Sequence, residues 1–169
     1  MVLMVIIISI IRHGGITMNE SKFTIIKDRM MLKQIKEELQ EVEGVFLVNA
    51  FKCDEVTEYC EKLNQILKIG YPISFTKERG DIFTKYVEYG YTEVGGLMKR
   101  LRWLIPYFKG SNWWIEIDIE CLKCFMDYYF QNAKSVNLTF FELTNNFLMD
   151  IENGEDGYEY RIMKCSEMM

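Results

Sequence analysis

Apolar residues recur at intervals of three and four positions in several stretches of the chain, a spacing that predicts amphipathic helices. Four such stretches cover residues 28–43, 55–69, 92–108 and 119–131. Asp28, Asp54 and Asp118 stand where a side-chain oxygen caps the first, second and fourth helix. Gly44 and Gly70 follow the first two helices, as expected where a helix ends.

Shorter runs of β-branched and aromatic residues, some of them alternating with polar residues, predict strands. They cover residues 45–51, 73–76, 83–89, 112–118, 136–143, 147–152 and 158–163. Turn residues separate the last three runs, which favours consecutive antiparallel pairing. The predicted fold class is therefore α+β, an antiparallel sheet with about four helices packed mainly on one face.

The chain has 169 residues, only two prolines, and neither a low-complexity linker nor a repeat. This length suits one core, so we expect residues 18–169 to form a single α+β domain.

Residues 1–11 are apolar and uncharged, but the run ends at Arg12 and is shorter than the about 20 residues of a spanning helix. It also lacks the basic region and cleavage site of a secretory signal. Gly14 and Gly15 can be encoded as GGA-GGN, a bacterial ribosome-binding sequence placed shortly before the codon of Met18. We interpret residues 1–17 as a non-native leader and Met18 as the start. The alternative is an N-terminal β-strand.

Acidic residues outnumber basic ones by 25 to 20, which gives a net charge of −5. Nucleic acids and anionic membranes are bound through Lys and Arg, so neither is an expected partner. A basic protein is the expected partner. The absence of a credible export signal and the odd count of five cysteines favour the reducing cytoplasm.

The sequence contains no motif for nucleophilic catalysis, phosphate binding or dinucleotide binding. Cys121 and Cys124 form a C-x-x-C pair, but a zinc site needs four ligands, and the one histidine, His13, lies in the predicted leader. Nearby acidic residues disfavour a reactive thiolate. We therefore expect ordinary thiols, no metal, no cofactor and no enzymatic activity.

Glu116 and Asp118 lie two residues apart on a predicted strand and so share one face. Such a pair suits acid/base chemistry or a hard metal. The simpler interpretation, which we prefer, is that both face solvent between buried isoleucines.

Two features suit a partner-binding surface. One is an acidic cluster on the last hairpin, comprising Asp150, Glu152, Glu155, Asp156 and Glu159. The other is the pair Trp113-Trp114, because adjacent strand residues point to opposite faces and one ring would be left exposed as an interface anchor. The alternatives are a solvated loop that protects a sheet edge and two buried rings.

Together, the α+β pattern, acidic balance, many aromatic residues and lack of catalytic motifs resemble the small acidic immunity proteins that neutralise bacterial toxins. The resemblance covers the chain from Met18 to the end. It implies an inhibitor whose acidic patch attracts a basic toxin or nuclease and whose aromatic anchors occlude it. The alternatives are a phage anti-defence inhibitor, a small carboxylate-dependent enzyme, and a regulatory or structural subunit of an assembly.

Overall fold

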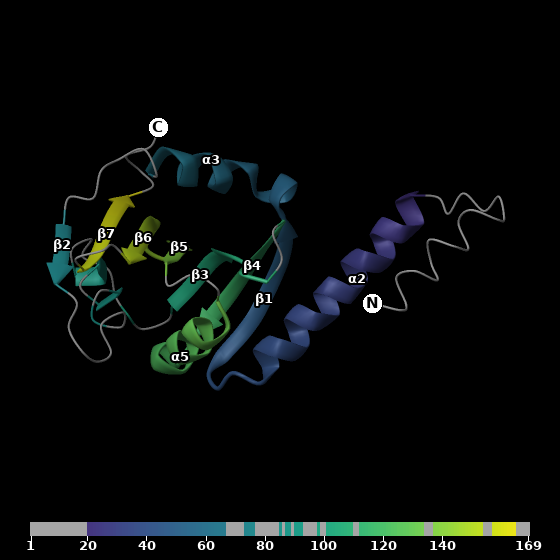
Figure 1. The fold of residues 1–169 in the computed structure, drawn as a ribbon, viewed down its shortest axis with the longest axis horizontal. Helices are drawn as coiled ribbons and strands as arrows, with labels where there is room; N and C mark the ends of the chain where they lie inside the picture. Colours follow the sequence, from purple (N-terminus) through teal and green to yellow (C-terminus); the bar gives the residue numbers. More distant parts are fainter. Residues whose placement is uncertain are drawn as a thin grey trace. The chain divides into compact units, whose positions relative to one another are not determined.

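The computed structural model describes residues 20–66, 73–76, 101–109, 112–133, 137–153 and 157–164, with positions 85, 87, 88, 90–92 and 98 (Figure 1). The predicted leader, residues 1–17, lies outside this part of the chain. Two compact units are distinguished, Met1–Ile35 and Lys36–Met169, and each is described by itself.

The first described helix, α2 (Glu20–Gln40), begins in the first unit and ends in the second. It starts earlier than the predicted Asp28 and ends before Glu43. In the first unit its side chains include exposed apolar ones, such as Phe23 and Met30. Gly44, at φ +67°, occupies the turn that leads into the sheet.

The second unit is built on a sheet of seven described strands: β1 (Val45–Lys52), β2 (Ile73–Thr76), β3 (Leu101–Pro106), β4 (Trp113–Ile119), β5 (Leu138–Glu142), β6 (Phe147–Asn153) and β7 (Gly157–Lys164). Their order is β1-β4-β3-β5-β6-β7-β2, and every neighbouring pair is antiparallel. An α+β fold with an antiparallel sheet is thus confirmed. Among the described strands, β1 and β2 form the two edges.

One face of the sheet packs against α5 (Leu122–Asn132), and we name it the α5 face. The fully buried indole of Trp103 stacks on Phe140 with ring centroids 3.8 Å apart, and it meets the Phe125 ring of α5 edge-on at 5.6 Å. Ile115 and Ile117, on β4, are fully buried on the same face.

The opposite face, the α3 face, is covered by a short 3-10 helix, η1 (Cys53–Val56), and by α3 (Thr57–Ile66). Its buried cluster consists of Val56, Leu104, Trp114, Phe141 and Leu148. Tyr59 of α3 meets the Phe141 ring edge-on at 5.0 Å. Because α3 and α5 lie on opposite faces, the expectation of helices mainly on one face is not confirmed.

The helix predicted over 92–108 is wrong at its second half, where β3 crosses the middle of the sheet. Leu101, Trp103, Leu104 and Ile105 are all buried. A run that is apolar on both faces satisfies helical spacing and strand spacing alike, so periodicity could not separate them. The strand predicted over 83–89 is also wrong at the described positions 85, 87 and 88, which are helical.

Candidate functional site

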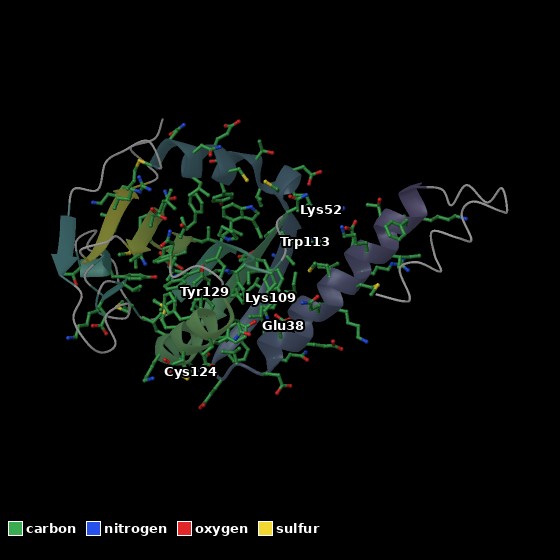
Figure 2. The ribbon with its side chains drawn as sticks, in the orientation of Figure 1. Glu38, Lys52, Lys109, Trp113, Cys124 and Tyr129 are labelled. Atoms are coloured by element: carbon green, nitrogen blue, oxygen red, sulfur yellow. A yellow bond between two sulfur atoms is a disulfide. The ribbon has the colours of Figure 1, made fainter. Side chains whose placement is uncertain are left out.

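Trp113 and Trp114 point to opposite faces of β4, as their adjacency predicts. Trp114 is buried at 5% exposure in the α3-face cluster, while Trp113 is half-buried at the end of the strand. The Nζ of Lys52, which is paired with Trp113 across β1 and β4, lies 6.0 Å from the Trp113 ring centroid (Figure 2). Trp113 is therefore the member of the pair that a partner can contact.

Asp150 lies in the interior of the fold. It is 4% exposed, and its Oδ2 accepts a hydrogen bond of 2.9 Å from Nε of Arg161, itself 5% exposed. The Nη2 of the same guanidinium also lies 2.9 Å from this oxygen. The hydroxyl of Thr139 donates to the other carboxylate oxygen. The structure thus assigns Asp150 to a buried ion pair. The side chains of the other four members of the predicted acidic cluster, Glu152, Glu155, Asp156 and Glu159, lie outside the described ones.

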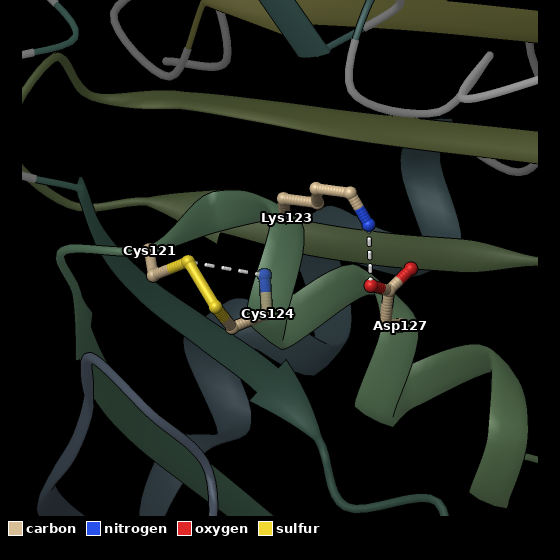
Figure 3. The surroundings of a disulfide bond; sticks show 4 residues. All are labelled: Cys121, Lys123, Cys124 and Asp127. Carbon is tan, nitrogen blue, oxygen red and sulfur yellow. Dashed lines mark hydrogen bonds and ion pairs between the residues drawn. A yellow bond between two sulfur atoms is a disulfide. The ribbon is translucent and has the colours of Figure 1, made fainter.

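Cys121 and Cys124 are joined by a disulfide at the start of α5, so the prediction of ordinary thiols is wrong (Figure 3). Cys121 is the N-cap of α5, in place of the predicted Asp118, and its sulfur accepts a hydrogen bond from the backbone N–H of Cys124 at 3.3 Å. The backbone carbonyl of Gly44 accepts the N–H of Cys121 at 3.3 Å. The disulfide therefore anchors the turn between β4 and α5 beside the start of β1.

Glu116 and Asp118 share the α3 face, as predicted, and Arg102 of β3 lies between them. The Nε of Arg102 is 2.7 Å from Glu116 Oε1 and 3.7 Å from Asp118 Oδ1. Asn49 of β1 donates to the other Glu116 oxygen at 2.9 Å. Both carboxylates are mostly buried, so the prediction that they face solvent is wrong. These contacts form a charged network across β1, β4 and β3.

Glu38, near the end of α2, binds three side chains through one carboxylate oxygen. Figure 2 labels Glu38 and one of the three, Lys109. The Tyr107 hydroxyl donates at 2.7 Å, the Tyr128 hydroxyl donates at 3.2 Å, and the Lys109 ammonium lies at 3.1 Å. Burial, and then the negative charge of Glu38, raises the pKa of Tyr128. Tyr128 therefore stays protonated and donates to Glu38. These four side chains link the end of α2 to α5 and to the connection between β3 and β4, so they stabilise the fold.

Edge strand β1 is the most accessible strand of the sheet whose side chains are described in full. Apart from Val45, each of its side chains is half-buried or exposed, and Phe46 is 52% exposed. By contrast, the interior strand β4 has five buried residues of seven. No charged residue occurs from Val45 to Phe51. Natural proteins usually protect such an edge with charges or proline, because its free backbone groups can pair with another strand.

A hollow of about 560 Å³ opens beside the first half of β1. Its apolar lining includes Leu39 from the end of α2, with Phe46 and Leu47 from β1. Lys36 and Glu43 supply charges at the lining. The hollow has room for an apolar side chain of a segment that lies along the strand.

Acidic side chains flank both ends of β1. Between residues 41 and 58 the chain has five acidic residues and one basic residue, Lys52. The five acidic side chains are all exposed, and they are Glu41, Glu43, Asp54, Glu55 and Glu58. A positively charged partner would be attracted to this edge from either end.

Searches against protein-family models, curated proteins and solved structures gave no match for this chain. Among the helices described, none combines the length and apolar character needed to cross a membrane. Within the same part of the chain, no three His, Cys, Asp or Glu side chains are grouped so that they could hold a metal ion.

The sequence pattern did not predict that β1 lies at the edge of the sheet, and so it did not identify Phe46 as an exposed candidate binding residue. The strand itself was predicted, but an edge is defined by which strands pair, and β1 pairs with β4 across more than sixty residues of chain. The one available signal was the lack of charge between Val45 and Phe51 beside acidic flanking residues.

Proposed function

We propose that this chain is a non-catalytic binding protein that holds an extended segment of a basic protein partner along β1. The observation that carries the proposal is an accessible, uncharged edge strand with acidic side chains at both ends. Main-chain pairing with the edge would provide affinity, and the hollow beside Phe46 would select an apolar side chain. The exposed acidic side chains would speed association.

Within this class, the role favoured by the acidic balance and the absence of a catalytic motif is that of an immunity or inhibitor protein. Such a protein blocks a basic bacterial toxin or nuclease by covering its active site. Its place of action would be the cytoplasm, where the toxin would otherwise act. Trp113, half-buried on β4 beside the far end of β1, would serve as a second anchor.

A photo-crosslinking amino acid at position 46 tests the site in the producing cells. It should capture one basic protein, identified by mass spectrometry. The matched control carries the same amino acid at Asp127, an exposed position on α5, and should not capture that protein. Equal capture at both positions, or capture of a second copy of this chain, would contradict the proposal.

Two substitutions then separate the contributions of shape and charge to binding of the captured protein. Phe46→Lys should weaken binding by at least about tenfold, chiefly through faster dissociation, because it removes an apolar anchor. Glu41→Lys with Glu43→Lys should slow association and reduce its salt dependence. Asp127→Lys is the charge control and should leave both rates unchanged.

A further inference from the structure

A second pair of cysteines comes together where β1 ends and η1 begins. Cys53 is exposed, Cys60 is half-buried on α3, and their sulfurs lie 3.0 Å apart. A covalent S–S bond measures about 2.05 Å, so a small rotation of either side chain brings the atoms to bonding distance. This pair goes beyond the proposed binding function and does not depend on it.

We propose that Cys53 and Cys60 form a redox-active dithiol that closes to a disulfide and fastens the start of α3 to the end of β1. Cys53 is the first residue of η1, directly after β1, and Cys60 ends the first turn of α3. The Cys60 sulfur also lies 3.8 Å from the carbonyl oxygen of Cys53, so the two residues already contact each other through backbone and side chain.

The surroundings give the two sulfurs different tasks. Cys53 is open to solvent and meets an external oxidant first. Burial, and then the neighbouring Cys53, raises the pKa of Cys60 to about 11. At neutral pH Cys60 is therefore a thiol, held beside the Trp114 indole, and it acts second. This is the order of an attacking and a resolving cysteine.

The oxidant is a small-molecule disulfide. The Cys53 thiolate attacks one of its sulfurs, forms a mixed disulfide and releases one small thiolate. Cys60 then loses its proton to solvent and attacks the Cys53 sulfur, which displaces the second small thiolate. Two protein thiols are oxidised by two electrons, and the external disulfide is reduced to two thiols.

Closing the bond has a local consequence for the α3 face. The cross-link constrains α3, whose Tyr59 packs on the ring of Phe141 in the buried cluster. A cross-link restricts the locally unfolded states of the segment more than its folded state. Local unfolding of α3 therefore becomes rarer. The oxidised protein should hold α3 in place more firmly than the reduced protein.

Glutathione disulfide is a suitable probe on the full-length chain, reduced first and then freed of reductant. Peptide mass spectrometry should show a Cys53–Cys60 link that has lost two hydrogen atoms and retains no glutathione. In Cys60→Ser, a glutathione adduct should accumulate on Cys53. In Cys53→Ser, the thiol of Cys60 should react at least about tenfold more slowly, because it is half-buried.

The double variant Cys121→Ser, Cys124→Ser is the matched control and should still form the link. Trypsin cleavage after Lys62, within α3, should become at least about tenfold slower on oxidation. Separate adducts on both cysteines, or no reaction at either, would overturn the dithiol. A link that leaves cleavage at Lys62 unchanged would overturn the fastening of α3.

Discussion

The buried ion pair between Asp150 and Arg161 allows a sharp test of the fold. Asp150→Asn keeps the size of the side chain but removes its charge, and leaves the guanidinium of Arg161 uncompensated at 5% exposure. Breaking one partner of a buried pair costs about 3–5 kcal/mol. This is a large share of the about 5–15 kcal/mol by which domains are stable.

Urea unfolding followed by tryptophan fluorescence measures the change directly. For a domain of this size, the same loss lowers the Tm by about 6–20 °C. Glu58→Gln is the control, because Glu58 pairs with Lys62 at the surface with 72% of its side chain exposed. It should change the free energy of unfolding by less than about 1 kcal/mol.

A double variant separates the missing partner from the missing volume. Asp150→Leu with Arg161→Met replaces the pair by apolar side chains, and it should recover most of the stability lost in Asp150→Asn, because neither charge is then left buried. If the free energy of unfolding of Asp150→Asn lies within about 1 kcal/mol of the wild-type value, the buried pair does not contribute the expected stability. If the loss is as large as expected, weaker partner binding by an Asp150 variant must be attributed to its destabilised fold and not to a lost contact with the partner.

Three further predictions concern the sheet and its first turn. Trp114→Ala should destabilise the fold by about 3–5 kcal/mol in urea, and Trp113→Ala by less than half of that, because only Trp114 lies in the buried cluster; equal losses would contradict the assignment. Gly44→Ala should lower the Tm, because Gly44 has φ +67° and an added Cβ would lie 2.8 Å from Cys121; an unchanged Tm would refute this. Alkylation of Cys60 by iodoacetamide in Cys53→Ser should accelerate with pH up to a pKa well above the ordinary thiol value, since burial favours the neutral form; a plateau reached by pH 9 would count against it.

Much of the fold could be predicted from local patterns. The strands over 45–51 and 112–118 and the last two strands of the sheet are confirmed, because side-chain alternation and turn residues act over short distances. The opposite orientation of Trp113 and Trp114 followed from the same alternation. The prediction for residues 101–106 was wrong, because a strand that is covered on both faces shows no alternation of apolar and polar residues.

The candidate sites depend on pairings that the sequence does not display. Asp150 was assigned to a partner-binding surface together with its acidic neighbours, and only the register of β6 on β7 places it opposite Arg161. The approach of Cys53 to Cys60 likewise requires the bend from β1 through η1 into α3. Edge or interior position is a property of strand order, which local propensity does not determine.

The strand order also sets limits on how the chain folds during synthesis. Strands β3 to β7 occupy the middle of the sheet, while both strands from the first half of the chain lie at its edges. The partner of β2 is β7, the last described strand, so β2 cannot pair until the ribosome has released residues 157–164. For most of translation, the uncharged strand β1 has no sheet to join, since β4 is more than sixty residues away. A nascent chain of this protein therefore carries an unprotected β1 until β4 emerges, and chaperone binding should be strongest in that interval.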